Sequence, residues 1–305
     1  MKKVWGSVAM LTATLLWGVA FSAQSRGMDF VEPMLFTSLR SAIGVIALVV
    51  VIMIFDLFRE KRLTLWGSAA TPEARKELLT GGLWCGVVIT FASIAQQSGL
   101  KYTTAGKTGF LTALYIVIVP VLGIFLKRKP TWLMWISVVM ALSGAYLLCG
   151  GIGSINRGEW FVIACAFIYS LHILVIDRYA GKCDCVRLSC IQFAVAFVLS
   201  VLLSLICGEP WEGEAVAASM PFWLFCGIGS SAVAFTLQMV AQKYLHPVTA
   251  TLLMSLESVF AVLGGWVFLK EWLSGRELCG CAVIFAAVII SQLPAAEKKK
   301  AVENA

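Results

Sequence analysis

The segment AGKTG at residues 105–109 has residue types that could do chemistry, because a glycine, a lysine and a threonine also end the phosphate-binding loop of nucleotide hydrolases. That loop needs another glycine five residues before Gly106, and Lys101 occupies this position. It also needs a soluble α/β domain, whereas the residues that follow are the apolar run FLTALYIVIVPVLGIFL. Spacing and context therefore exclude a nucleotide site and raise the question of why Lys107 enters an apolar helix.

Three charged residues lie about a helical turn or more inside apolar stretches. A charge at the helix centre costs about 2.5–3.5 kcal/mol and normally faces protein or a water-filled cavity. Glu257 is close to mid-depth, so it is either a site for protons or a substrate amine, or a structural ion pair or hydrogen-bond partner. Lys107 lies near one end of its stretch, where it either snorkels to the membrane surface or lines a cavity and pairs with an anionic substrate or Glu257. Arg40 lies deeper, and we expect it to link helices structurally.

Uncharged polar and aromatic side chains add further candidates. Gln96 and Gln238 either flank a central cavity or form hydrogen bonds between helices. His172 is one of two histidines in the chain, and a lone histidine in an apolar helix is more often a packing residue than a functional group. Trp17 either packs at a helix interface or forms a wall or gate of a cavity.

Small residues and one proline shape the helices that carry these side chains. Gly123, Gly264 and Gly265 are expected to allow close helix crossings, as small residues do in membranes. Pro120 lies inside an apolar stretch and should kink that helix, because proline removes a backbone donor.

The composition places all these residues in a membrane protein. Of 305 residues, 60% are hydrophobic and 13% are charged, whereas about a quarter are charged in a typical soluble domain. The mean hydropathy is +0.88. About 20 apolar residues cross a bilayer as a helix. Ten such runs are present, at 4–24, 32–55, 78–99, 103–126, 131–150, 158–177, 186–207, 221–242, 246–269 and 276–293. We interpret the first run as a helix rather than a signal peptide, because it lacks a small-residue cleavage site.

The basic residues orient these ten runs, because loops rich in Lys and Arg stay in the cytoplasm. With a cytoplasmic N-terminus, two of the 24 basic residues lie inside spans and 17 fall on the inner side. The outer side holds five, namely Arg26, Lys101, Arg157, Lys270 and Arg276. The bias predicts a multi-pass protein of the plasma or inner membrane with both termini in the cytoplasm.

The sequence indicates no cofactor, metal ion or disulfide. Cys183 and Cys185 lack the second pair of cysteines that a zinc site would need, and most other cysteines lie in apolar runs, where cysteine acts as a small hydrophobe. The net charge of +7 reflects the membrane topology and implies no nucleic-acid partner. The expected partners are the lipid bilayer, a small-molecule substrate and, as a candidate coupling ion, the proton, in a monomer or homodimer.

The chain contains an internal duplication. Aligning GSVAMLTATLLWGVAF from Gly6 with GEWFVIACAFIYSLHI from Gly158 places Trp17 on Tyr169, and the same shift places Arg40 on Gln192. Further on, QQSGLKYTTAGKTGFLTAL aligns with QMVAQKYLHPVTATLLMSL. This second shift matches Gln96 with Gln238, Lys101 with Lys243, Tyr115 with Glu257 and Gly123 with Gly265.

Each repeat has five helices, an odd number, so the second repeat must insert upside down. We expect the first repeat over residues 1–153, the second over 154–295 and a basic cytoplasmic tail over 296–305. Inverted repeats of this kind are common in carriers that work by alternating access.

Four segments carry a resemblance to a known family: LLWGVAF in the first run, EPMLFTSLR leading into the second, TTAGKTGFLTALYIVIVPVLG in the fourth, and SLESVFAVLGGWVFLKEWLSGRELCG across the last two. They resemble the drug/metabolite transporter superfamily in its ten-helix EamA-type branch. The resemblance covers nearly the whole chain and does not indicate the substrate. That family typically has a proline after the glutamate of the ninth helix, where Ser258 follows Glu257 here.

The resemblance implies alternating access around a central cavity lined by helices one, three, four, six, eight and nine. We therefore expect an all-α polytopic protein of ten spans that transports a small polar or amphipathic metabolite, with export favoured, and that is not an enzyme. The alternatives are a membrane-embedded transferase, for which the chain lacks clustered acids and histidines, and a channel, which would explain Glu257 less well.

The topology can be tested with single cysteines placed at Lys61 and Glu212 in a cysteine-free background. We expect an impermeant thiol reagent to reach the Glu212 position from outside the cell and the Lys61 position only from the cytoplasm. Labelling of both positions from one side would contradict ten spans with inverted repeats.

Overall fold

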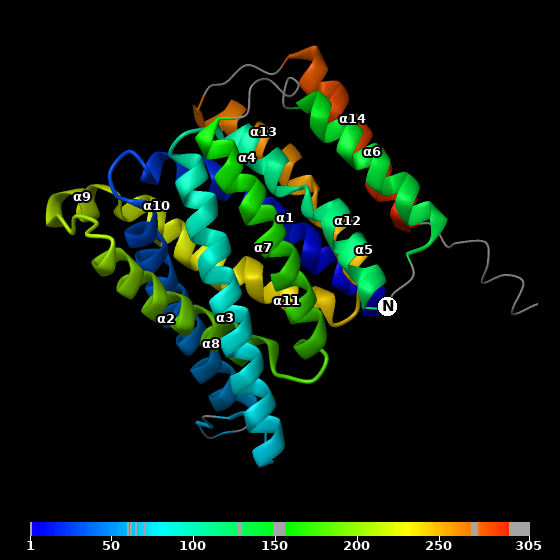
Figure 1. Ribbon diagram of the computed structural model, residues 1–305. Helices are drawn as coiled ribbons and strands as arrows, with labels where there is room; N and C mark the ends of the chain where they lie inside the picture. Colours follow the sequence, from blue (N-terminus) through cyan, green and yellow to red (C-terminus); the bar gives the residue numbers. More distant parts are fainter. Residues whose placement is uncertain are drawn as a thin grey trace, which may run out of the picture.

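The computed structural model describes residues 2–59, 61, 63, 64, 66–69, 71–126, 130–148, 156–269 and 274–292, which are helical almost throughout (Figure 1). The helices of the first repeat are α1 (Lys2–Gly27), α2 (Pro33–Arg59), α3 (Pro72–Leu100), α4 (Ala105–Thr112), α5 (Tyr115–Phe125) and α6 (Trp132–Leu148). Those of the second are α7 (Arg157–Tyr179), α8 (Cys185–Ile206), α9 (Gly213–Ala218), α10 (Met220–Phe225), the π-helix η1 (Cys226–Ala234), α11 (Phe235–Gln242), α12 (Pro247–Met254), α13 (Leu256–Leu269) and α14 (Gly275–Gln292).

The predicted ten-helix membrane fold is confirmed. Within the described residues, eight helical stretches are long and apolar enough to cross a membrane. Three of them join several helices: α4 with α5, α10 with η1 and α11, and α12 with α13. Shorter apolar stretches in α6 and α14, Trp132–Gly144 and Leu278–Ile290, complete the ten predicted spans. The basic tail after residue 295 lies outside the described residues.

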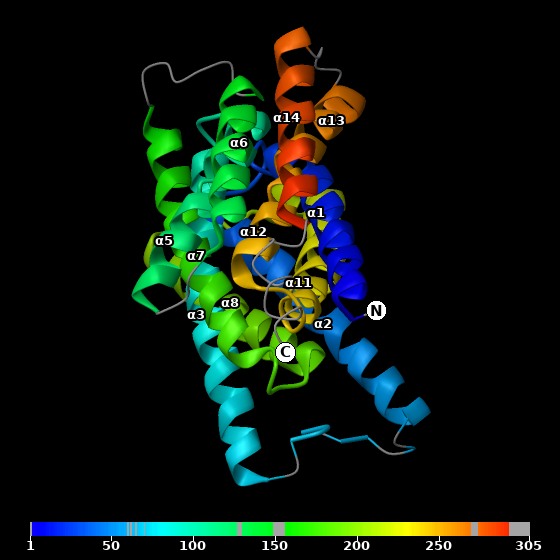
Figure 2. The ribbon, with the colours of Figure 1, turned by 90° about the vertical axis from the view of Figure 1, so that its right-hand side faces the viewer.

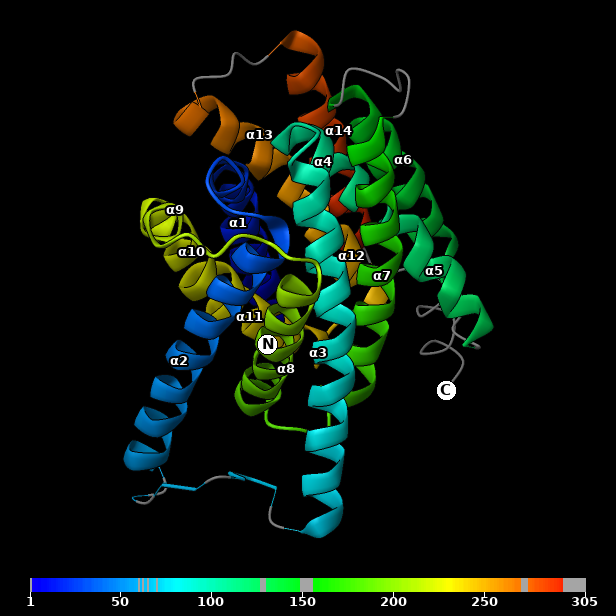
Figure 3. The ribbon, with the colours of Figure 1, turned by 60° about the vertical axis from the view of Figure 1, so that its left-hand side comes forward.

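The two repeats interlock rather than standing side by side. Helix α1 of the first repeat packs along α13 of the second, and α7 of the second packs along α3 of the first. Helix α8 contacts both α2 and α3 (Figure 3). Helices α6 and α14 pack against each other at one side of the molecule (Figures 1 and 2). The remaining helices therefore surround the centre of the protein with elements from both repeats.

Glycines allow α1 and α13 to approach closely where they cross. A Cβ atom added to Gly18 would overlap Phe260 and lie 2.9 Å from the backbone nitrogen of Ala261. One added to Gly264 would lie 3.3 Å from the Ser22 hydroxyl oxygen. Small residues permit this packing because helices in lipid associate largely through van der Waals contact.

The fourth and ninth spans are interrupted at matching positions. Helix α4 ends at Thr112 and α5 begins at Tyr115, while α12 ends at Met254 and α13 begins at Leu256. The repeat alignment places Thr112 on Met254, so the two interruptions are equivalent. The break in the ninth span forms although Ser258 stands where the family typically has proline. The Ser258 hydroxyl donates to the Gly109 carbonyl of α4 at 3.0 Å, which ties the two interrupted spans together.

Carboxylates join α2 to α8 at both ends of this antiparallel pair. At the C-terminal end of α2, Asp56 accepts two hydrogen bonds of 2.6 and 2.8 Å from Arg187 at the start of α8. Just beyond the C-terminal end of α8, Glu209 accepts from the backbone N–H groups of Met34 and Leu35 at 3.0 and 2.7 Å. The repeat alignment places Leu35 on Arg187 and Asp56 on Gly208, the residue before Glu209, so the two contacts occupy nearly equivalent places in the repeats.

The close crossing of α1 and α13 predicts that Gly18→Ala destabilises the protein by about 1–3 kcal/mol, because overpacking displaces the Phe260 backbone. The effect is measured as a lower apparent Tm in detergent. Gly181→Ala is the matched control, since an added Cβ there meets no atom of the described residues within 4 Å. Equal Tm values for the two variants would contradict the tight crossing.

Candidate functional site

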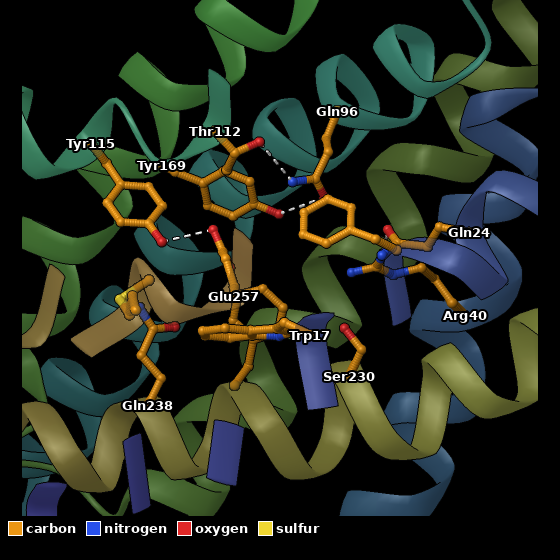
Figure 4. Close-up of a pocket in the computed structure, with 13 residues that line it drawn as sticks. Trp17, Gln24, Arg40, Gln96, Thr112, Tyr115, Tyr169, Ser230, Gln238 and Glu257 are labelled. Carbon is orange, nitrogen blue, oxygen red and sulfur yellow. Dashed lines mark hydrogen bonds between the residues drawn. The ribbon is translucent and has the colours of Figure 1, made fainter. Parts of the chain in front are cut away.

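A buried cavity lies at the centre of the molecule, between the two repeats (Figure 4). Helices from both repeats supply its lining, which consists of Trp17, Phe21, Gln24, Arg40, Gln96, Thr112, Tyr115, Tyr169, Ser230, Phe235, Gln238, Met254 and Glu257. The cavity has a volume of about 30 Å³, which accommodates a few waters. Sites for small-molecule ligands are about ten times larger or more. The walls must therefore move apart before a metabolite can enter.

The internal symmetry is centred on this cavity. Four pairs of repeat-equivalent residues contribute both members to the lining: Trp17 with Tyr169, Gln96 with Gln238, Thr112 with Met254, and Tyr115 with Glu257. The same cavity wall is thus built twice from the same backbone positions, with different side chains. Because the side chains differ, the two halves of the cavity wall differ in their chemistry.

Glu257 and Tyr115 meet at the interruptions of their two spans. The Tyr115 hydroxyl donates to Oε1 of Glu257 at 2.7 Å, and both side chains are buried (Figure 4). No ion pair to Glu257 is present among the described residues. Its second carboxyl oxygen is available to a proton or to a cationic ligand.

Arg40 lies in the cavity wall away from Glu257 (Figure 4). Its Nη1 donates to Oε1 of Gln24 at 2.8 Å, and the same oxygen accepts a 2.6 Å hydrogen bond from Gln97. These bonds join α2, α1 and α3, which is the interhelix contact expected for Arg40. The side chain is only 1% exposed, and within the described structure no carboxylate pairs with it. A buried guanidinium without a counterion is suited to bind an anionic ligand group.

Among the described residues, three buried polar atoms of the lining have no hydrogen-bond partner: Nε of Arg40, Nε1 of Trp17 and Oε1 of Gln238. Such atoms are costly to bury and normally find a partner. Two are donors and belong to Arg40 and Trp17, while the acceptor belongs to Gln238. The cavity therefore offers donors to one ligand group and acceptors, on Gln238 and Glu257, to another.

The remaining polar residues of the cavity contact one another only weakly. Gln96 donates to the Thr112 hydroxyl at 3.4 Å and accepts from Tyr169 at 3.5 Å. The amide of Gln238 approaches the Met254 sulfur at 3.8 Å. Long, loose contacts of this kind can be exchanged for contacts to a ligand at little cost.

Lys107 lies outside the cavity lining. Its Nζ forms a 2.9 Å ion pair with Glu159 at the start of α7, and its side chain is 41% exposed. Glu159 is itself held by a capping box with Asn156, in which each side chain accepts from the other residue's backbone N–H. The lysine in AGKTG therefore joins the N-terminal ends of α4 and α7.

The other sequence candidates lie behind the cavity or in the helix packing. His172 is fully buried and its Nε2 lies 2.7 Å from Oε1 of Gln192, the residue equivalent to Arg40. Its ring packs against Tyr169 and Phe235, with ring centroids 6.4 and 5.9 Å apart. Pro120 lies inside α5, past the interruption of the fourth span, and Gly123 and Gly265 are buried.

Sequence reasoning did not single out Gln24, Thr112, Ser230, Phe235 and Met254 as candidates. Two signals in the sequence could have found some of them. Phe21 and Gln24 follow Trp17 at helical spacing, so the three share one face of α1. Thr112 and Met254 are repeat-equivalent positions next to Tyr115 and Glu257.

A ten-span helical protein with two repeats around a buried polar cavity has the architecture of a membrane carrier. The family model of the EamA-like transporter family matches twice, over residues 4–150 and 156–292. The chain belongs to this family, within the drug/metabolite transporter superfamily, and is a membrane transporter.

Curated relatives are also transporters. The chain is 25% identical over 298 residues to an uncharacterized transporter of Archaeoglobus fulgidus, and this match covers 96% of this chain and 87% of that protein. It is 25% identical over 184 residues to the threonine/homoserine exporter RhtA of Escherichia coli K12, covering 58% of this chain and 60% of that protein. A solved crystal structure has the same fold, with a TM-score of 0.74 and 21% identity over 94% of this chain and 96% of the other. The family and the two curated relatives favour a transporter over the transferase and channel alternatives.

The position of Lys107 predicts the effect of Lys107→Gln. We expect substrate binding to be unchanged and stability to fall by about 1 kcal/mol, because a partly exposed ion pair is lost while the cavity stays intact. Binding is measured by ligand-induced shifts of Tm, and ATP should cause no shift in either protein. Loss of substrate binding in Lys107→Gln would assign the lysine to the substrate site.

Proposed function

We propose that this protein exports a small zwitterionic metabolite of the amino-acid type, by alternating access and in exchange for a proton. The observation that carries the proposal is the presence of Arg40 and Glu257 in the lining of one buried cavity, neither paired with an opposite charge among the described residues. A ligand with one negative and one positive group would compensate both.

Arg40 and Trp17 would bind the carboxylate of the substrate. Both have a buried donor that finds no partner in the part of the chain that the structure describes, and the guanidinium can also bind a carboxylate through two parallel hydrogen bonds. Gln24 accepts a 2.8 Å hydrogen bond from Arg40 and is itself held by a 2.6 Å hydrogen bond from Gln97, so the cation need not reorganise when the substrate arrives.

Glu257 and Gln238 would bind the ammonium group. The Tyr115 hydrogen bond fixes one oxygen of Glu257 and leaves the other oxygen for the substrate. A buried carboxylate needs a positive partner or a proton. The substrate ammonium group and a proton would therefore compete for the same oxygen. This competition would couple export of the substrate to movement of a proton across the membrane in the opposite direction.

Aromatic and apolar side chains would enclose the rest of the substrate. The rings of Trp17 and Phe235 meet edge to face with centroids 4.8 Å apart, and Phe21 and Met254 complete this part of the wall. These residues suit a substrate with a short side chain. The similarity to RhtA, which is named a threonine/homoserine exporter, supports a substrate of this size and polarity.

Export and orientation are part of the proposal. The bias of basic residues supports cytoplasmic termini in the plasma or inner membrane. Each repeat, 1–153 and 154–295, would then serve as one of the two inverted units whose exchange of conformation opens the cavity to one side and then the other.

The experiment uses purified protein and L-threonine, its amide, which lacks the carboxylate, and N-acetyl-L-threonine, which lacks the ammonium. Wild-type protein should bind threonine about 10- to 100-fold more tightly than either analogue, because each analogue leaves a buried charge unpaired. Arg40→Gln should lose the preference over the amide only. Glu257→Gln should lose the preference over the N-acetyl compound only.

Lys107→Gln, which removes a charge outside the cavity lining, is the matched control and should keep both preferences. In proteoliposomes, Glu257→Gln should also abolish the acceleration of transport by a pH gradient. Equal binding of all three compounds by the wild type would contradict the zwitterion proposal. If a pH gradient still accelerates transport by the Glu257→Gln variant, the Glu257 carboxyl group has a structural role only.

A further inference from the structure

Two lysines and two acidic residues occupy equivalent positions in the two repeats. Lys101 directly follows α3 as its C-cap, and Lys243 directly follows α11 in the same way. Glu32 directly precedes α2, and Asp184 is the N-cap of α8. The repeat alignment places Lys101 on Lys243 and Glu32 on Asp184. The chain thus has two copies of one lysine–carboxylate combination.

The two copies lie at opposite ends of the bundle. Helix α1 begins beside Tyr244 and Leu245, which directly follow Lys243, because a Cβ atom on Gly6 would contact both residues. Glu32 follows shortly after the opposite end of α1. Helix α7 begins beside Tyr102, which a Cβ on Gly158 would contact, and Asp184 follows shortly after its far end. We call these the Lys101 end and the Lys243 end. The predicted topology assigns them to the outer and inner sides.

Only one copy is paired. At the Lys101 end, Nζ of Lys101 contacts both carboxyl oxygens of Glu32, at 2.6 and 2.7 Å. At the Lys243 end, no ion pair joins Lys243 to Asp184 in the described structure.

Asp184 is occupied by its own helix instead. It accepts from the backbone N–H groups of Val186 and Arg187 at 3.0 Å, and Nη1 of Arg187 lies 3.4 Å from its other oxygen. Lys243 is exposed. The equivalent pair at this end is therefore separated although both partners are present.

The contacts between α2 and α8 behave differently. Asp56 with Arg187 and Glu209 with the N-terminus of α2 occupy nearly equivalent places in the repeats too, yet both contacts are formed at once. These contacts hold the α2–α8 pair at both ends. The lysine–carboxylate pair is formed at one end and broken at the other, as expected for a contact that changes between two states of an inverted repeat.

We propose that Lys101–Glu32 and Lys243–Asp184 are alternative latches, of which the first closes the Lys101 end in the present conformation and the second closes the Lys243 end in the other. The inference rests on the alternating access in the proposed function and extends it to the residues that exchange. Forming one latch requires the α3–α4 or α11–α12 connection to approach the start of α2 or α8. The two connections move in opposite senses as the repeats exchange conformation.

The exposure of the latch suits this role. The side chains of Lys101 and Glu32 are 34% and 36% exposed, and ion pairs at the surface contribute little to stability. A strong buried pair would hold the transporter in one state. A weak pair shifts the balance between the two states by roughly fivefold.

The test measures how fast impermeant thiol reagents label Ser230→Cys, a position in the cavity lining, from each side in proteoliposomes with a cysteine-free background and no substrate. Lys101→Glu places two like charges together at the Lys101 end. It should raise labelling from that side relative to the other by roughly fivefold or more. Lys243→Glu should shift the ratio in the opposite direction, and Lys101→Glu combined with Glu32→Lys should restore it.

Lys182→Glu is the matched control, because Lys182 forms an exposed 2.6 Å ion pair with Glu77 that the repeat alignment does not duplicate. It should leave the labelling ratio unchanged. If the cysteine is labelled from both sides but Lys243→Glu does not change the ratio of the two labelling rates, the latch is overturned and alternating access stands. A cysteine that is labelled from one side only in every variant would overturn both.

Discussion

A carboxyl group at mid-depth in a membrane protein needs a partner inside the protein, and for Glu257 this partner is Tyr115. Both residues lie at helix interruptions, and the repeat alignment makes them equivalent. Their hydrogen bond therefore marks the place where the two repeats meet, and the cavity forms around it. At each interruption, backbone N–H and C=O groups lose their partners within the helix. In a membrane, such groups are tolerated only where they are buried in protein or line a water-filled cavity.

The fold follows from the sequence to a large extent, because hydrophobic spans and the repeat leave clear patterns. Ten apolar runs, the shift that matches Gln96 with Gln238, and the mid-depth position of Glu257 are all visible in the residues alone. Contacts between helices distant in sequence are not. The pairing of Lys107 with Glu159 depends on how α4 crosses α7, and no spacing rule encodes that crossing.

The break in the ninth span illustrates a second limit. Proline is the usual sequence signal for such a break, and this chain lacks one after Glu257. The interruption is instead accompanied by side-chain bonds, from Ser255 to the Leu252 carbonyl and from Ser258 to the Gly109 carbonyl. Arg40 shows the same limit at the cavity. Its role as an interhelix link could be anticipated, but its position in the cavity wall depends on how α2 packs beside η1.

The contacts that join α2 to α8 also constrain the biogenesis of the protein. Asp56 and the first turn of α2 are synthesised early, while Arg187 and Glu209 belong to the second repeat and emerge from the ribosome much later. A nascent chain that has inserted only its first five helices thus holds a carboxylate and a helix N-terminus without their final partners. The first half of the protein can reach its mature packing only when the second half enters the membrane, so the two halves are expected to fold as one unit.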